Sequence, residues 1–186
     1  MTRFVIMTVG KTHSGKTTFA KQLESELQEA VVIDQDNHAE LINKHYRKLR
    51  PAKGPNTLKY TVTNAIVEYA ATHSNFHIIL SNSNLYKQGR TNVLQYFRKK
   101  GFQSIIVYFD LPVEILKERV ERTKRNKSIF RHASSFMEVL ERQVLLGQEE
   151  PTQDEANHLF IIKNPAEATN VLQQIKEISE MNPNHC

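Results

Sequence analysis

The 186-residue chain has little of several features that would indicate a specialised architecture. It contains a single cysteine, Cys186, which excludes a disulfide-stapled scaffold or a cysteine-based metal site and favours a cytoplasmic protein. The eight histidines have no metal-ligand spacing, and no apolar run approaches the ~20 residues that a membrane span needs. We find no repeat, low-complexity stretch or linker. The composition therefore predicts one globular domain over residues 1–186, with no membrane segment.

Acidic residues are almost missing from the middle of the chain. Residues 41–109 contain only one, Glu68, against eleven basic residues: Lys44, Arg47, Lys48, Arg50, Lys53, Lys59, Lys87, Arg90, Arg98, Lys99 and Lys100. A field of this sign attracts a polyanion or an anionic acceptor. The alternative is a solvated face with a basic bias. No interleaved aromatic residues mark a base-stacking platform, so the charge alone does not specify nucleic acid.

The strongest motif present is GKTHSGKT at residues 10–17, which matches the phosphate-binding (Walker A) pattern G-x-x-x-x-G-K-[ST]. It follows the apolar run FVIMTV and precedes an amphipathic helical pattern. Strand, glycine-bounded loop and helix form the context that this motif requires. The sequence therefore predicts a nucleoside triphosphate site, and the absence of an Asn-Lys-x-Asp guanine motif favours ATP.

Each loop residue has a predicted task. Gly10 and Gly15 let the backbone turn and approach the phosphates, while the amides and the following helix N-terminus bind the anion. Lys16 is expected to reach the β- and γ-phosphates, and the Thr17 hydroxyl to ligate Mg²⁺. The remaining loop residues predicted to line the ATP site are His13, Ser14 and Thr18.

Apolar β-branched runs alternate with helical patterns along the chain, which predicts a parallel sheet covered by helices. The expected strands are 3–9, 31–34, 76–81, 104–109 and 158–163. The expected helices are 16–29, 37–47, 56–73, 86–100, 112–125, 134–147 and 165–180. Ligands of such sheets bind beyond the carboxyl ends of the strands, so the polar residues that follow each strand are the candidate site.

Asp34 and Asp36 follow the second expected strand. A kinase needs a carboxylate that orients the acceptor hydroxyl and takes its proton. Residues two apart in an extended chain point to opposite faces, so at most one of the two carboxylates is expected to face the phosphates. The alternative role is structural, with Asp36 or Asn37 capping a helix that begins near His38.

These motifs, in this order, resemble the P-loop kinases of the polynucleotide-kinase-like and zeta-toxin-like group, which have an AAA-type ATP-binding domain. The resemblance rests on the loop, the Asp-x-Asp pair, the segment IILSNSNLYKQGR and the segment SIIVYFDLPVEILKERVERTKR. It extends over nearly the whole chain. It implies an α/β/α sandwich with a five-stranded parallel sheet of order 2-3-1-4-5 and a helical lid around residues 122–135.

The resemblance also implies roles for individual residues. Asp36 matches the general base, with Asp34 and Arg90 on the acceptor side, and Arg122 and Arg125 match lid arginines that stabilise the transferring phosphoryl group. The alternative for the two lid arginines is a basic helix face paired with Glu118 and Glu121.

Two positions depart from the family pattern. Asn82 stands where an aspartate usually supports Mg²⁺ through water, so Mg²⁺ binding is expected to be weaker or to need help from Asp34. His38 stands where an arginine often holds an acceptor phosphate, which weakens the case for a polynucleotide acceptor.

The sequence thus predicts an ATP- and Mg²⁺-dependent kinase whose acceptor is the hydroxyl group of a nucleic-acid 5′ end, a nucleoside or another small molecule. The alternative is a nucleotide-binding regulator or an ATPase with weak or no transfer, which Asn82 favours. The sequence predicts no oligomeric state.

Overall fold

The core of the molecule is a five-stranded parallel sheet with strand order β2-β3-β1-β4-β5. The structure, a computed structural model, describes residues 2–125 and 127–180, so Cys186 lies outside the described residues. The strands are β1 (Phe4–Gly10), β2 (Ala30–Ile33), β3 (His77–Ser81), β4 (Gln103–Phe109) and β5 (His158–Ile162). The predicted sheet, including its order, is confirmed.

The central strand, β1, shows why a continuous apolar run in this sequence forms a strand. All seven residues of β1 are buried, because both of its edges pair with other strands and both of its faces are covered. Val5 lies opposite Ile78 of β3 on one side and Ser104 of β4 on the other. Continuous apolar sequence is the pattern expected of a strand with two covered faces.

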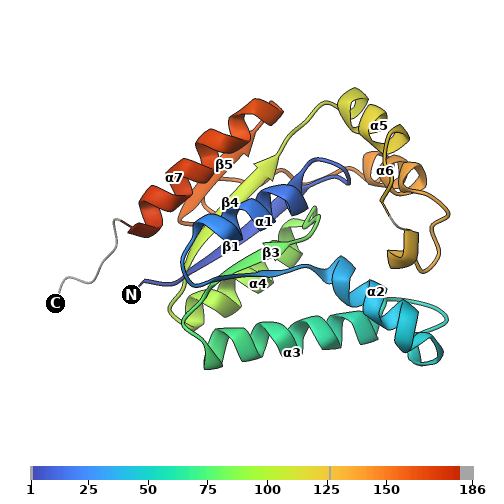
Figure 1. The fold of residues 1–186 in the computed structure, drawn as a ribbon, viewed down its shortest axis with the longest axis horizontal. Coiled ribbons are helices and arrows are strands. Elements are labelled where there is room, and N and C mark those ends of the chain that lie inside the picture. Colours follow the sequence, from blue (N-terminus) through green and yellow to red (C-terminus); the bar gives the residue numbers. More distant parts are fainter. Residues whose placement is uncertain (1, 126, 181–186) are drawn as a thin grey trace.

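Helices cover both faces of the sheet (Figure 1). They are α1 (Lys16–Glu26), α2 (Gln35–His45), α3 (Thr57–His73), α4 (Lys87–Lys99), α5 (Val113–Glu121), α6 (Phe136–Leu145) and α7 (Ala168–Glu180). Leu23 of α1 and Leu172 of α7 pack in the core on one face, and Ala71 of α3 and Phe97 of α4 pack in the core on the other. The three-layer α/β/α arrangement is therefore confirmed.

The remaining helices shape the site. Figure 1 shows α2, α5 and α6 gathered beyond the carboxyl ends of the strands. Short 3-10 turns follow α2 at Arg47–Leu49 (η1), occur in the lid at Lys127–Ile129 (η2), and precede α7 at Pro165–Glu167 (η3). The expected helix 112–125 was too long, because α5 ends at Glu121 and Arg122 is its C-cap.

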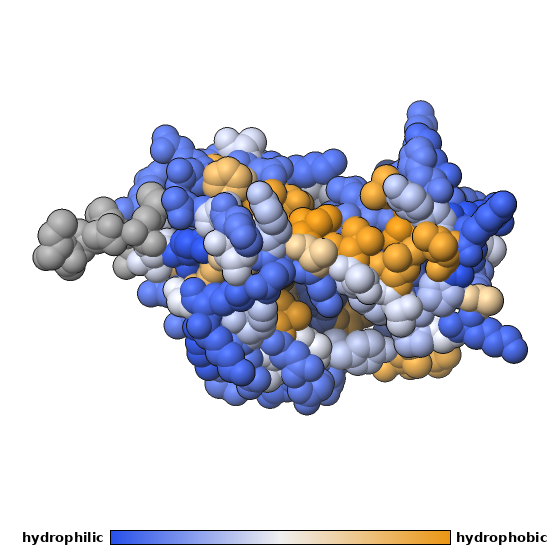
Figure 2. All heavy atoms as spheres, turned by 90° about the horizontal axis from the view of Figure 1, so that it is seen from below, coloured by the Kyte–Doolittle hydropathy of each residue, from blue (hydrophilic) through white to orange (hydrophobic). Residues whose placement is uncertain are grey.

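Helix α3 is apolar in composition yet mostly exposed, with only Thr63 and Ala71 buried. Its exposed large hydrophobic residues are Tyr60, Ile66 and Tyr69. Figure 2 views the molecule from the α3 side and shows a band of hydrophobic residues crossing a largely hydrophilic face. Within residues 2–125 and 127–180, no helix has the length and apolar character that crossing a membrane requires.

Candidate functional site

The phosphate loop turns at two glycines whose positions tolerate no side chain. Gly10 has a φ of 146°, and a Cβ there would lie 2.9 Å from the Phe109 carbonyl oxygen. Gly15 has a φ of 103° and is the N-cap residue of α1, without a side-chain cap of its own. Because neither backbone suits a residue with a Cβ, the glycine spacing is a geometric requirement of this turn. The first amides of α1 remain available to an anion.

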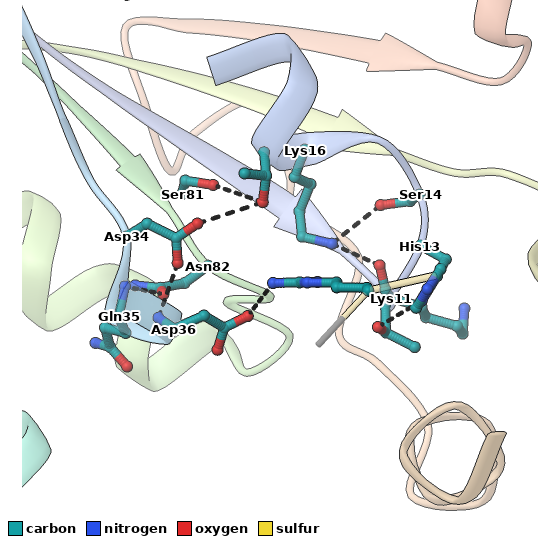
Figure 3. Close-up of polar contacts among 12 residues, drawn as sticks. Lys11, His13, Ser14, Lys16, Asp34, Gln35, Asp36, Ser81 and Asn82 are labelled. Carbon is teal, nitrogen blue, oxygen red and sulfur yellow. Dashed lines mark hydrogen bonds and ion pairs between the residues drawn. The ribbon is translucent and has the colours of Figure 1, made fainter. Parts of the chain in front are cut away.

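The side chain of Lys16 curls back over the loop (Figure 3). Its Nζ donates to the Lys11 carbonyl oxygen at 2.5 Å and to the Ser14 Oγ at 3.0 Å. Burial lowers the pKa of Lys16 to about 7, although the carboxylates of Asp36 and Asp34 act in the opposite direction. An anion placed beside the loop would favour the charged ammonium.

A cavity of about 650 Å³ opens beside the loop, between the carboxyl ends of the strands and the lid. Its walls come from five parts of the chain. The loop and α1 contribute Thr12, His13, Gly15, Lys16, Thr17 and Thr18; the start of α2 contributes Gln35 and Asp36; α3 contributes Lys59; the end of β3 contributes Ser81, Asn82 and Ser83; the segment from α5 to α6 contributes Arg119, Thr123, Arg125, Ile129, Phe130, Phe136, Val139, Arg142 and Gln143. The volume and the polar lining suit a nucleotide.

Three oxygen-bearing side chains meet at the first turn of α1. The Thr17 hydroxyl donates to Asp34 Oδ2 at 3.3 Å and accepts from the Ser81 hydroxyl at 3.5 Å. Asp34 also caps α2, because its Oδ1 accepts from the Asp36 amide at 2.8 Å. The expected capping by Asp36 or Asn37 is therefore wrong. Burial raises the pKa of Asp34.

Asn82 lies at the same edge of the sheet but turns its amide oxygen away from Thr17. That oxygen accepts from the Gln35 backbone amide at 3.3 Å, and it thereby joins the end of β3 to the start of α2. Asp34 is thus the carboxylate nearest to Thr17 among these residues. The sequence left two outcomes open here, weaker Mg²⁺ binding or help from Asp34. The contact of Asp34 with Thr17 is compatible with the second, and both stay predictions.

Asp36 faces the cavity and forms an ion pair across it. Its Oδ2 accepts from a guanidinium nitrogen of Arg125 at 2.7 Å, and both side chains are partly exposed, 43% for Asp36 and 36% for Arg125. Arg125 also lies 5.3 Å from the centre of the Phe136 ring. The pair joins the mouth of β2 to the lid.

Comparison with known proteins identifies the family at this point. A model of the AAA domain matches residues 5–146, which is most of the chain. The chain belongs to this AAA-domain family. The predicted AAA-type ATP-binding domain is thus confirmed.

Solved structures share the fold of this AAA domain at low sequence identity. Kti12 from Chaetomium thermophilum, in complex with ADP-AlF3, is 20% identical with a TM-score of 0.63, over 93% of this chain and 97% of that one. A putative kinase from Chloroflexus aurantiacus is 16% identical with a TM-score of 0.67, over 98% of both chains. The Mycobacterium tuberculosis APS kinase, in complex with AMPPNP and APS, is 14% identical with a TM-score of 0.59, over 96% and 98%. Curated proteins give no match.

Of the two arginines expected to reach the cavity, Arg125 lines it and Arg122 does not, while Arg119 of α5 lines it as well. Arg119 lines the cavity and donates to the His13 carbonyl oxygen at 3.1 Å. Arg122 is outside the cavity lining, because its side chain is 79% exposed and pairs with Glu118 at 2.7 Å. The proposed alternative for Arg122, a basic helix face, therefore describes its position. The sequence carried no signal for Arg119; in the structure it shares a face with Thr123, four residues later, which also lines the cavity.

Helix α6 also contacts the phosphate loop directly. The Gln143 side-chain oxygen of α6 accepts from the Thr12 amide at 2.7 Å. The His13 ring packs edge-on against Phe136 at 4.8 Å, and burial lowers the pKa of His13 to about 4. His13 is therefore neutral near pH 7 and connects the loop of this AAA domain to its lid.

The expected position of Arg90 on the acceptor side of the site is wrong. Its side chain is 0% exposed and forms a bidentate pair with Glu155, with Nε–Oε2 and Nη2–Oε1 distances of 2.7 and 2.9 Å. Its third nitrogen donates to the Asn84 carbonyl oxygen at 3.0 Å. Arg90 thus braces the loop after β3 against the segment before β5, and it does not line the cavity in which an acceptor would contact it.

Lys59 of α3 adds to the wall of the AAA-domain cavity, and His38 of α2 holds α2 against α3. Lys59, which the motifs did not single out as a site residue, lines the cavity from α3. Burial lowers the pKa of Lys59, while Asp36 and Asp34 act to raise it. His38 Nδ1 lies 2.8 Å from the Thr63 hydroxyl, so this histidine joins α2 to α3.

Proposed function

We propose that the protein is an ATP- and Mg²⁺-dependent kinase that transfers the γ-phosphoryl group of ATP to a hydroxyl acceptor. The observation that carries the proposal is Asp36, a carboxylate that shares one cavity with Lys16 and Thr17 of the phosphate loop and pairs with the lid residue Arg125. A carboxylate near a triphosphate is repelled by the phosphate charges unless Mg²⁺ and Lys16 offset the repulsion. A carboxylate in this position is therefore best explained by a role in catalysis, such as orienting the acceptor hydroxyl. The kinase names of several structural neighbours add support at the level of fold.

The loop and the lid would hold the phosphates. The Lys16 ammonium would exchange its contacts with the loop for phosphate oxygens. Arg119, which contacts the His13 carbonyl oxygen of the loop, and Arg142, which lines the same cavity, would add positive charge. Charge-assisted hydrogen bonds of this kind stabilise the equatorial oxygens of the transferring group. Closure of the lid excludes water, so that the acceptor rather than solvent is attacked.

The oxygen atoms around Thr17 fit Mg²⁺, which prefers hydroxyl, carboxylate and water ligands. Among the described residues there is no cluster of three or more His, Cys, Asp or Glu side chains suited to a metal, which is consistent with an ion held mainly by phosphate oxygens and water. Thr17 would hold the ion, with Asp34 and Ser81 supporting its water ligands. When bound, the ion supplies charge that offsets the negative charge of the β- and γ-phosphates.

Asp36 would act as the base after Arg125 leaves it. ATP presents Arg125 with a more highly charged partner than one carboxylate, so binding favours movement of the guanidinium onto the phosphates. The freed carboxylate then accepts the hydrogen bond of the acceptor hydroxyl and takes its proton as the O–P bond forms.

The test separates ATP binding from transfer. We expect Asp36→Asn to lower acceptor-dependent ADP formation by about 10²- to 10⁴-fold, the usual contribution of a general base, while affinity for a non-hydrolysable ATP analogue stays within about threefold. The acceptor panel would contain nucleosides, 5′-hydroxyl oligonucleotides, sugars and antibiotics. Asp154→Asn, the same change on the exposed surface, is the matched control, and Lys16→Ala should abolish both binding and transfer. Unchanged turnover in Asp36→Asn would remove Asp36 from the mechanism.

A nucleotide-binding regulator or ATPase is the second candidate, and Asn82 favours it. The amide oxygen of Asn82 brings no charge and already accepts from the Gln35 amide. This candidate predicts that the ATP analogue binds, while no member of the acceptor panel stimulates ADP formation.

A further inference from the structure

A second cavity of about 500 Å³ lies between helix α2, the η1 turn and the lid. It is lined by Glu40, Asn43, Lys44, Arg47, Arg50, Ser128, Phe130 and Arg131. Phe130 lines both this cavity and the first one, so the two spaces meet at that ring. A ligand in the second cavity would therefore lie beside the space proposed for phosphoryl transfer.

The walls of the second cavity are held together by hydrogen bonds to backbone carbonyl groups. The Asn43 side-chain nitrogen donates to the Ser128 carbonyl oxygen of η2 at 2.6 Å, and its oxygen accepts from Arg50 at 2.8 Å. Arg131 donates to the carbonyl oxygens of Pro51, at 3.2 Å, and of Gly54. These bonds fix the lid against the segment after α2, so the cavity exists before any ligand binds.

The charge of this cavity is strongly one-sided. Four cations (Lys44, Arg47, Arg50 and Arg131) face one carboxylate, Glu40. None of the four forms an ion pair with a carboxylate in the described part of the chain, where the four ion pairs involve other residues. The surrounding sequence offers no compensation. Residues 41–67 hold six basic residues and no acid, and residues 122–137 hold five basic residues and no acid.

We propose that this second cavity is a phosphate-binding subsite; assigning the bound phosphate to the acceptor rests on the function proposed above. Cations gathered without carboxylate partners repel one another, and an anion relieves that repulsion. A phosphate dianion offers three terminal oxygens to guanidinium groups, which bind such groups through paired hydrogen bonds, and a single carboxylate offers only two. The volume exceeds that of phosphate alone and leaves room for part of the molecule that carries it.

The phosphate has two possible sources, a small phosphorylated molecule or a nucleic-acid backbone, and two probes distinguish them. Inorganic phosphate would be titrated by calorimetry, and a fluorescein-labelled single strand of about ten nucleotides by anisotropy. In both cases the phosphate loop is first saturated with a non-hydrolysable ATP analogue and Mg²⁺, so that it cannot bind the probe. A steep loss of affinity with salt is expected only for the oligonucleotide, because it releases several counterions on binding.

The variant that tests the subsite is Lys44→Glu with Arg47→Glu, because both side chains are exposed and their loss leaves no buried group unpaired. We expect at least about tenfold weaker binding of whichever probe binds the parent protein, since two phosphate contacts are lost. Arg98→Glu with Lys99→Glu, also exposed and at the C-terminal end of α4, makes the same change in net charge and should alter affinity less than about threefold. The milder Lys44→Gln with Arg47→Gln should give a smaller loss in the same direction.

Each result decides the proposal. Selective loss of phosphate or oligonucleotide binding in the Lys44 and Arg47 variants supports the subsite and names the source. Equal loss in the Arg98 and Lys99 variant would mean diffuse attraction and overturn it, as would failure of both probes to bind the parent protein. The readout needs no turnover. A protein that binds the probes but transfers no phosphoryl group would therefore contradict the proposed function and leave the subsite standing.

Discussion

Two arginine–carboxylate pairs, with nearly identical distances, occupy opposite environments. Arg90 and Glu155 are sealed in the interior with side-chain exposures of 0% and 2%, while Arg125 and Asp36 are 36% and 43% exposed. The closest N–O distance is 2.7 Å in both pairs. Distance alone therefore does not reveal how firmly a pair is held.

The difference lies in what happens when each pair separates. Separating Arg90 from Glu155 leaves two charges without water, which is costly in a buried site. Separating Arg125 from Asp36 returns both charges to solvent, so the net cost is about 0–1 kcal/mol. One pair is suited to fixing the loop after β3, and the other is suited to changing partners when a ligand arrives.

The largest expected effect comes from breaking the buried pair. Arg90→Ala should lower the free energy of unfolding by about 3–5 kcal/mol, because it leaves the Glu155 carboxylate buried and unpaired. Urea denaturation measures the loss. Arg98→Ala, an exposed arginine on the same helix, serves as the control and should change stability by less than about 0.5 kcal/mol. A loss below about 1 kcal/mol in Arg90→Ala would show that water reaches Glu155.

Breaking the exposed pair should separate activity from stability. In Arg125→Ala we expect kcat to fall about 10²- to 10³-fold through loss of transition-state stabilisation, with a stability change within about 1 kcal/mol. Steady-state kinetics and urea denaturation on the same samples give both values. Arg122→Ala is the matched control and should leave kcat nearly unchanged, because Arg122 pairs with Glu118 outside the cavity. An equal loss of kcat in the two variants would show that Arg125 has no specific role in stabilising the transition state.

The exposed pair should also tune the pH dependence of nucleotide binding, the smallest of the three effects. Burial sets the pKa of Lys16 at about 7 in the free protein, and bound phosphate favours the protonated form. Binding therefore takes up a proton as the pH rises above about 7, and affinity should fall by up to about tenfold per pH unit in that range. Calorimetry with the ATP analogue and Mg²⁺ measures it.

Arg125 and Asp36 should shift the pH above which nucleotide affinity falls in opposite directions. Arg125 lowers the pKa of Lys16 and Asp36 raises it. Arg125→Ala should therefore shift the loss of affinity to higher pH, and Asp36→Asn to lower pH. Lys16→Arg, which stays protonated, should abolish the pH dependence altogether. A shift in the same direction for both variants would contradict the electrostatic explanation.

Sequence patterns predicted the sheet, its order and the position of the phosphate loop because these follow from local rules. A continuous apolar run followed by Gly10 and Gly15 admits few structures, and parallel strands place their following residues at one edge. Of Asp34 and Asp36, only Asp36 lines the cavity, as expected, but the i, i+2 reasoning does not apply because Asp36 lies in helix α2 and not in extended chain. Asp34 turns to Thr17, and Asp36 lines the cavity.

The errors concern residues whose position depends on distant partners. Arg90 is buried because Glu155, 65 residues away, meets it, and no spacing rule within the helix reveals that contact. Arg122 lies outside the cavity and Arg119, which the sequence did not single out, lines it, because the packing of Leu116 and Val120 against the core sets the rotation of α5. Long-range contacts of this kind require the folded structure.

The contact of Arg131 with the carbonyl groups of Pro51 and Gly54 has a consequence for the order of events in a reaction cycle. Because one guanidinium joins the lid to the segment after α2, a lid that swings open carries that segment with it. Both cavities then become accessible in a single step. The second cavity, which Arg50 and Arg131 both line, would therefore move together with this part of the chain.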